Sequence, residues 1–304
     1  MDKCLKSFEN QTFKNFEIIF VDDCSTDGTY DFLLEYQKNN KLNIQVLKND
    51  VNSGPAYSRN RGILLSTSDY VTFCDCDDWY DVTYLSEMVS LIETTASNLV
   101  FCGHKVVNSK NHVQFRPITN HNGIISKSEA WGLDADSLCM LMVQSSIIKR
   151  IPLPDVRNGE DAATVPLLIA VSDQIAVTSS CLYNYFRRIN SASQSVSDKT
   201  ITSFENAFLY TKKHFPVHLK DELEYIGIRN LLYSTVISIM TIGYNISRIE
   251  DILQTFQADF PFWYSNKYFH QIALSKRLVL FLLHHKLYPI IKLVAIVRKI
   301  IITI

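Results

Sequence analysis

The sequence predicts an α/β fold, with a mainly parallel sheet flanked by helices and followed by a helical C-terminal region. Short β-rich runs alternate with amphipathic segments in the first half of the chain, which is typical of a parallel sheet with helical crossovers. Acidic residues directly follow two of these β-rich runs. Beyond Lys199 the sequence is almost wholly helical in character. We therefore predict two domains, residues 1–199 and 200–304.

The individual elements follow from residue type and periodicity. The β-rich runs are dominated by β-branched and aromatic residues, and the segments between them have helical periodicity. Strands are expected over residues 16–21, 42–47, 69–76 and 98–107. The helices between them are expected over residues 30–38, 55–66 and 83–94, which together predict a nucleotide-binding type of sheet. Later helices are expected over residues 135–144, 204–214, 223–241 and at the C-terminus.

Composition restricts the class of protein. With 47% hydrophobic and 20% charged residues and a formal net charge of -1, the chain resembles an ordinary globular protein. Neither nucleic-acid binding nor a disordered tail is indicated. The seven cysteines are odd in number and no secretory leader is recognisable, so we expect buried thiols in a reducing cytoplasm. No stretch reaches the roughly 18–20 uninterrupted apolar residues needed to cross a bilayer.

Carboxylates cluster at the ends of two predicted strands. In open parallel sheets, ligands bind beyond the carboxyl ends of the strands. Asp22 and Asp23 follow the first strand, and Asp75, Asp77 and Asp78 lie at the tip of the third. Because side chains alternate along a strand, Asp75 and Asp77 are expected on one face. Carboxylates this close repel one another unless a cation lies between them, and their oxygens suit Mg²⁺ or Mn²⁺. The alternative is a solvated acidic turn with ordinary capping residues.

A helix N-terminus lies between these acidic segments. In NSGPAYSRNRG, residues 52–62, Gly54 suits a turn and Pro55 suits the first helical position. Arg59 then falls about one turn inside the helix. A helix N-terminus with a nearby arginine favours an anion, whereas the alternative is a surface helix whose arginines face water.

These segments resemble a known enzyme family. In order and spacing, VDDCSTDGT, NSGPAYSRNRG, FCDCDDWY and NGEDAATVPLL resemble the motifs of family 2 glycosyltransferases, which have the GT-A fold. The resemblance spans roughly residues 1–195, on the scale of a large domain. It implies a GT-A-like nucleotide-sugar-binding catalytic domain. In that domain Asp23 contacts uracil or ribose, with Asp22 nearby, and Arg59 approaches the nucleotide.

The resemblance also assigns the reacting groups. It implies that Asp75 binds on the ribose side, that Asp77 holds the Mn²⁺ or Mg²⁺ bridging the diphosphate, and that Asp161 is the base. The chemistry agrees, because a departing nucleoside diphosphate builds negative charge and an acceptor hydroxyl must lose its proton. Arg187 and Arg188, in a segment that resembles the end of the family's domain, are further candidates for diphosphate contact and receive no assignment.

The implied reaction is an inverting transfer. A single sugar would pass from a nucleoside diphosphate sugar, with UDP favoured by the resemblance, to a glycan or lipid-linked acceptor in cell-surface polysaccharide biosynthesis. The QxxRW motif of processive synthases is absent, which favours addition of one sugar. A nucleotidyltransferase is less well supported, because the N-terminus lacks a glycine-rich basic loop.

Two departures from the family pattern bear on activity. Family members usually open with a strand and a Pro-aromatic-Asn turn, whereas residues 1–15 here match the helix that follows. Loss of that strand is expected to expose sheet edges and weaken nucleotide binding, which leaves open an inactive nucleotide-sugar-binding or membrane-associated remnant. In addition, Pro166 follows Asp161 by five residues, where a helical proline typically costs about 3 kcal/mol or imposes a kink. Glu160 is the next candidate for the base.

The C-terminal segment has a pattern of its own. Residues 276–304 contain no acidic residue, and basic positions at His285, Lys292 and Lys299 recur every seven residues beside apolar ones. This spacing predicts one basic helical face, as in a helix that lies on an anionic membrane surface. We therefore expect a protein peripheral to the inner face of the plasma membrane. A packed core helix is the alternative.

Overall fold

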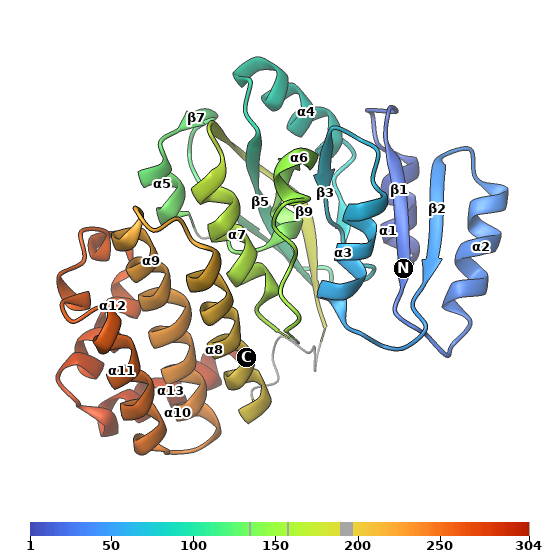
Figure 1. The fold of residues 1–304 in the computed structure, drawn as a ribbon. Helices are drawn as coiled ribbons and strands as arrows, with labels where there is room; N and C mark the ends of the chain where they lie inside the picture. The colour runs from blue at the N-terminus through green and yellow to red at the C-terminus, as the bar shows by residue number, and fades with distance from the viewer. Residues whose placement is uncertain (134, 157, 189–196, 304) are drawn as a thin grey trace. The chain divides into compact units, whose positions relative to one another are not determined.

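The computed structural model describes the backbone of residues 1–133, 135–156, 158–188 and 197–303, with side chains of the last helix described as far as Arg298. The chain forms two units, Met1–Ile189 and Asn190–Ile304 (Figure 1). Residue 199, where the sequence analysis placed the boundary, lies in the first turn of helix α8 (Asp198–His214).

Unit 1 is built from alternating helices and strands, as the sequence predicts. Helices expected over residues 30–38, 55–66 and 83–94 are confirmed. The elements are α1 (Asp2–Glu9), β1 (Glu17–Asp22), α2 (Thr29–Asn39), β2 (Asn43–Lys48), α3 (Pro55–Leu65), β3 (Tyr70–Thr72), β4 (Trp79–Tyr80), α4 (Tyr84–Thr95), β5 (Leu99–Asn108), β6 (Val113–Arg116), β7 (Gly123–Ile125), α5 (Lys127–Gly132), η1 (Leu138–Met140), β8 (Leu141–Gln144), α6 (Ser145–Ile148), α7 (Glu160–Val171) and β9 (Ile175–Arg187).

The strands form two sheets whose pairing is mixed. β1 and β2 are parallel, and a seven-stranded sheet has the order β3-β8-β5-β9-β4, with β6 on β5 and β7 on β9. Among the pairings of the larger sheet that the described residues form, only β5–β9 is parallel. The α/β class is thus confirmed, but the expected mainly parallel sheet is wrong, because β8 returns antiparallel between β3 and β5. One edge each of β1 and β3 has no strand partner among the described residues.

Helix α1 packs against both sheets. Its apolar residues Cys4, Leu5 and Phe8 recur at helical spacing and are buried. The Phe8 ring packs edge-on against Phe20 of β1 and Tyr80 of β4, with ring centroids 6.2 Å and 5.8 Å apart, respectively. Such aromatic pairs add about 0.5–1.5 kcal/mol each beyond the burial of apolar area. One hydrophobic core therefore joins α1, the β1–β2 pair and the larger sheet.

Two expected elements differ in the structure. The strand expected over residues 69–76 ends at Thr72, and a turn closed by Asp78 N–H donating to Asp75 O at 3.0 Å follows. The helix expected over residues 135–144 is instead the 3-10 turn η1 followed by strand β8. The apolar run at residues 138–143 suits either a helix or a doubly buried strand, and its pairing with β3 and β5 decides for the strand.

Unit 2 is helical, as expected. Gly227 begins a π-helical turn. Glycine suits this position because a β-carbon there would lie 2.3 Å from the Phe256 ring and 2.7 Å from the Phe208 ring. Its helices are α8, α9 (Lys220–Ile226), η3 (Gly227–Tyr233), α10 (Ser234–Ile242), α11 (Ile246–Asp259), η4 (Trp263–Ser265), η5 (Phe269–Gln271), α12 (Leu274–His284) and α13 (Tyr288–Thr303).

One helical run of unit 2 has the length and composition of a membrane span. In the part of the chain that the structure describes, only Lys220–Ile242 meets this criterion, and 67% of its most apolar stretch is buried within the protein. Burial of this kind is also found in core helices of soluble proteins. The run is therefore weak evidence for a membrane span.

The cysteines are free thiols with differing exposure. Cys4, Cys102 and Cys139 are buried as expected, whereas Cys76 is exposed in the turn after β3. The expectation of buried thiols is thus wrong for Cys76, because the strand assumed to bury it ends earlier.

Candidate active site

Asp22 and Asp23 lie at the end of β1 and make different contacts. Asp23 Oδ1 accepts hydrogen bonds from Asn49 Nδ2 and the Ser53 amide, both at 2.8 Å, and its Oδ2 accepts from the Gly54 amide at 2.7 Å. Asp22 is 4% exposed, and its Oδ2 accepts from the Ser25 amide at 3.0 Å. Asp22 Oδ1 has no hydrogen-bond partner among the described residues. Asp23 therefore anchors the start of α3. Asp22 has one carboxylate oxygen, Oδ1, that can still accept a hydrogen bond.

The hydrogen bonds of Asp23 predict a stability effect for Asp23→Asn. Burial opposes ionisation, but the bonds from Ser53, Asn49 and Gly54 together lower the pKa of Asp23. A lowered pKa means that the stabilisation is present above the unfolded-state pKa of about 3.9 and is lost as pH falls through the folded-state pKa. We expect Asp23→Asn to lower the free energy of unfolding at pH 7 by about 1–3 kcal/mol, measured by urea titration.

A matched control is available in the same loop. Asp50 is exposed, and no hydrogen bond of its side chain is found among the described residues, so Asp50→Asn removes the same charge without those bonds. Equal stability of the Asp23→Asn and Asp50→Asn proteins would contradict an anchoring role for Asp23.

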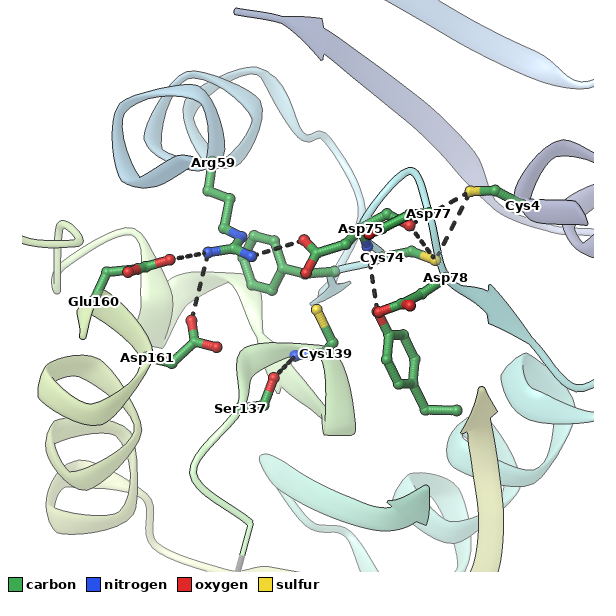
Figure 2. Close-up of polar contacts among 12 residues, drawn as sticks. Cys4, Arg59, Cys74, Asp75, Asp77, Asp78, Ser137, Cys139, Glu160 and Asp161 are labelled. Carbon is green, nitrogen blue, oxygen red and sulfur yellow. Dashed lines mark hydrogen bonds and ion pairs between the residues drawn. The ribbon is translucent and has the colours of Figure 1, made fainter. Parts of the chain in front are cut away.

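Arg59 of α3 brings three carboxylates together (Figure 2). Its Nη2 lies 2.8 Å from Asp75 Oδ1, and its Nη1 lies 2.7 Å from Glu160 Oε1 and 3.5 Å from Asp161 Oδ1. The Arg59 side chain is 13% exposed, so solvent screens these pairs less than surface pairs. Helix α3 is held in place by Asn60, whose side chain exchanges two hydrogen bonds with the backbone of Leu153. The structure thus unites Arg59, Asp75 and Asp161, three of the residues predicted from the sequence.

Asp161 occupies the first turn of α7. Gly159, at φ 94°, supplies the left-handed conformation that precedes the helix. The helix continues through Pro166 to Val171, so the proline does not end it, and most of its residues are buried. Desolvation raises the pKa of Asp161 to about 6, although Arg59 opposes the shift. A carboxylate with a pKa near the working pH is suited to accept a proton.

The remaining acidic residues face other partners. The Asp77 carboxylate pairs with Arg188. Asp78 is 2% exposed and accepts hydrogen bonds from the Tyr183 hydroxyl at 2.5 Å and the Phe186 amide at 2.7 Å. Burial raises the pKa of Asp78 to about 7 despite these bonds. Asp75 and Asp77 were expected on one face of a strand; they lie on a turn instead and pair with different arginines.

A divalent cation at this site requires oxygen ligands from the protein. Among the described residues, no group of three His, Cys, Asp or Glu side chains is arranged to hold a metal ion. Mg²⁺ in nucleotide-dependent enzymes is usually held by one or two carboxylates together with substrate phosphates and water. The Asp77 carboxylate is 27% exposed on its turn, and so fits this requirement as a single protein ligand.

Three contacts of the site were not predicted from the sequence. Glu160 was only a substitute for Asp161, and neither Tyr183 nor Asn49 was singled out. Asn49 is buried and joins Asp23 to Ser58 of α3. Its position directly after β2 was a usable signal, since it also lies at the carboxyl end of a strand. Nothing in the local sequence marks Tyr183 as a partner of Asp78.

Comparisons with known proteins identify the family of the chain. Residues 1–156 match the family model described as glycosyl transferase family 2. The chain is 25% identical over 195 residues to the putative teichuronic acid biosynthesis glycosyltransferase TuaG of Bacillus subtilis, which is 64% of this chain and 76% of TuaG. It is 36% identical over 90 residues to the Escherichia coli UDP-Glc:alpha-D-GlcNAc-diphosphoundecaprenol beta-1,3-glucosyltransferase WfaP, covering 30% of this chain and 35% of WfaP.

The fold is also found among solved structures. The structure of Staphylococcus aureus TarS residues 1–349 in complex with UDP-GlcNAc superposes with a TM-score of 0.72 at 19% identity, over 97% of this chain and 86% of TarS. The same TarS segment in complex with UDP gives a TM-score of 0.68. These likenesses establish the GT-A fold. Because the family model covers more than half of the chain, and the named relatives are glycosyltransferases, the chain belongs to glycosyl transferase family 2.

Proposed function

We propose that the protein transfers a single sugar from a UDP-sugar to a glycan or lipid-linked acceptor, with inversion at the anomeric carbon. The observation that carries this proposal is the placement of Asp161, a desolvated carboxylate next to Arg59 and Asp75. The complexes of TarS with UDP-GlcNAc and UDP support a UDP-linked donor. The names of WfaP and TuaG support an acceptor in surface-glycan biosynthesis.

The described residues have separate roles in the proposed reaction. Asp161 takes the proton of the acceptor hydroxyl as the hydroxyl oxygen attacks the anomeric carbon, and the bond to the diphosphate oxygen breaks on the opposite face. Asp75 contacts the nucleoside on the ribose side. The family resemblance assigned the uracil or ribose contact to Asp23, but both of its carboxylate oxygens accept hydrogen bonds from the protein, so we give this contact to Asp22. Oδ1 of Asp22 has no partner among the described residues, and a buried acceptor without a partner is costly. Asp23 acts by fixing the loop that begins α3.

A divalent cation completes the proposed site. Asp77 is the residue proposed to hold Mn²⁺ or Mg²⁺. When bound, the cation neutralises the negative charge that develops on the departing diphosphate. Because Arg188 pairs with Asp77 in the structure, we propose that it contacts the same diphosphate.

Hydrolysis of nucleotide sugars tests the proposed reaction. The full-length protein is incubated with a set of UDP-, GDP- and dTDP-sugars and Mn²⁺, and release of the nucleoside diphosphate is measured. The anomer of the freed sugar is then read by proton NMR before mutarotation. Release of UDP with an inverted sugar supports the proposal. Release from non-uridine donors only, or a retained anomer, contradicts it.

We further propose that the C-terminal helices attach the protein to an anionic membrane surface. Exposed apolar side chains recur along α12 at Leu274, Leu278 and Phe281, and along α13 in a second row. The α13 row consists of Ile290, Leu293, Ile296 and Val297. The absence of acidic residues from 276–304 favours an anionic surface.

The basic face expected from the sequence is not formed as predicted. Lys292 Nζ donates to the Met240 and Gly243 carbonyl oxygens, both at 2.7 Å, at the C-terminal end of α10. The side chain of Lys299 lies outside the described residues. His285 is exposed. The proposed membrane contact therefore rests on the apolar rows, with Lys276 and Lys286 as nearby cations.

Point substitutions on the apolar rows test the membrane contact. The protein carrying Leu278→Glu and Leu293→Glu is expected to float at least tenfold less with phosphatidylglycerol liposomes at low salt, because two exposed anchors become charged. Leu209→Glu, at a 57% exposed position of α8, is the control. Flotation of the parent should fall as salt rises. Equal flotation of parent and double variant, or none by the parent, contradicts the proposal.

A further inference from the structure

Glu160 and Asp161 share one guanidinium unequally. Arg59 Nη1 lies 2.7 Å from Glu160 Oε1 but 3.5 Å from Asp161 Oδ1. Glu160 is 11% exposed at its side chain, and Asp161 is 25% exposed. The other guanidinium nitrogen, Nη2, lies 2.8 Å from Asp75. Both terminal nitrogens of the Arg59 guanidinium are thus held by carboxylates other than that of Asp161.

The longer distance from Arg59 to Asp161 affects how well Asp161 can accept a proton as a base. A carboxylate in a close ion pair with arginine loses about 1–3 pKa units and therefore holds a proton poorly. Desolvation acts in the opposite direction at Asp161, and so does repulsion by Glu160 and Asp75. The other groups facing Asp161 are the Ser137 side chain and the Cys139 thiol of η1.

We propose that Glu160 is a positioning residue for the reaction. By holding Nη1 of Arg59, Glu160 keeps the guanidinium at the longer distance from Asp161, so that Asp161 remains able to accept a proton. Arg59 in turn links the base on α7 to Asp75 after β3. This inference rests on the proposed function of Asp161 as the base, but the geometry that it describes is testable without any substrate.

The experiment titrates Asp161 directly in the full-length chain. Aspartate labelled with ¹³C at the side-chain carboxyl is incorporated, and the resonance absent from Asp161→Asn is assigned to Asp161. The pKa of that resonance is measured by NMR in the parent, in Glu160→Gln and in Arg59→Gln. We expect Glu160→Gln to lower the pKa by about one unit or more, and Arg59→Gln to raise it by a similar amount.

Opposite signs in Glu160→Gln and Arg59→Gln follow from charge alone, since Glu160 raises and Arg59 lowers the pKa of Asp161. Glu160→Asp therefore provides the decisive comparison, because it keeps the charge but shortens the side chain that holds Nη1 of Arg59. Positioning predicts a lower pKa of Asp161 in Glu160→Asp, whereas charge repulsion alone predicts no shift. Glu93→Gln removes the same charge from an exposed site on α4 and should leave the resonance unmoved. If Arg59→Gln does not fold, Arg59→Lys is used, since one ammonium cannot hold Asp75 and Glu160 together; a smaller upward shift is then expected.

The outcomes separate this inference from the proposed function. An unshifted pKa of Asp161 in Glu160→Asp, or in Glu160→Gln, overturns the positioning role of Glu160. Full sugar-nucleotide hydrolysis by Asp161→Asn overturns the base instead, whatever the titration shows. A lowered pKa in Glu160→Asp together with a lower rate of donor hydrolysis supports both.

Discussion

Replacing Asp161 with asparagine is expected to reduce sugar transfer by about 10²- to 10⁴-fold while leaving UDP binding unchanged. The amide cannot take the proton of the acceptor hydroxyl. Folding should tolerate the change, because desolvation disfavours the ionised form of Asp161 and a neutral group avoids that cost. Donor hydrolysis and calorimetric titration with UDP and Mn²⁺ measure the two quantities separately.

The pH dependence of the parent provides a second measure of the same residue. The base must be ionised to act, and desolvation raises the pKa of Asp161 to about 6. Activity is therefore expected to rise with pH through about 6 and to be lost below it. Unaltered turnover in Asp161→Asn would transfer the role to another group, with Glu160 the first to test. Loss of UDP binding would instead indicate a structural role.

Asp161 was assigned by the resemblance of its segment to a family motif, whereas three other site residues are marked by their immediate neighbours. Asp22 and Asp75 follow short apolar runs, and Arg59 follows a glycine–proline helix start. Each signal is local, since a few neighbouring residues suffice to reveal a strand end or a helix start. The fold class could be predicted for the same reason, because alternating strand and helix patterns indicate a sheet covered by helices. Such patterns do not show which strands pair with each other.

The parts that were missed depend on distant residues. Pairing of Arg59 with Glu160 joins positions 101 residues apart, and Asp23 meets Ser53 across 30 residues. Lys292 matched a basic stripe by spacing, yet it reaches the Met240 carbonyl oxygen 52 residues away. The predicted strand directions were wrong for a similar reason. The antiparallel orientation of β8 is set by its pairing with β3 and β5, and its apolar run has no period that distinguishes a strand from a helix.

Asp77→Asn is expected to abolish the contribution of Mn²⁺ to UDP binding. An amide oxygen is a weaker ligand than a carboxylate and does not offset the charge of a divalent cation. The loss should be at least as large as the roughly 10- to 100-fold in metal affinity that accompanies loss of an outer-shell partner. Calorimetric titration with UDP, with and without Mn²⁺, measures it.

The ion pair with Arg188 provides the decisive comparison for Asp77. If Asp77 serves only to hold Arg188, Asp77→Asn and Arg188→Gln should weaken UDP binding alike, whether or not Mn²⁺ is present. If Asp77 holds the cation, the two variants differ. Asp77→Asn then binds UDP equally with and without Mn²⁺, whereas Arg188→Gln binds more weakly overall but still gains affinity from the metal. Retention of the full metal effect in Asp77→Asn would place the cation ligand elsewhere on the turn after β3.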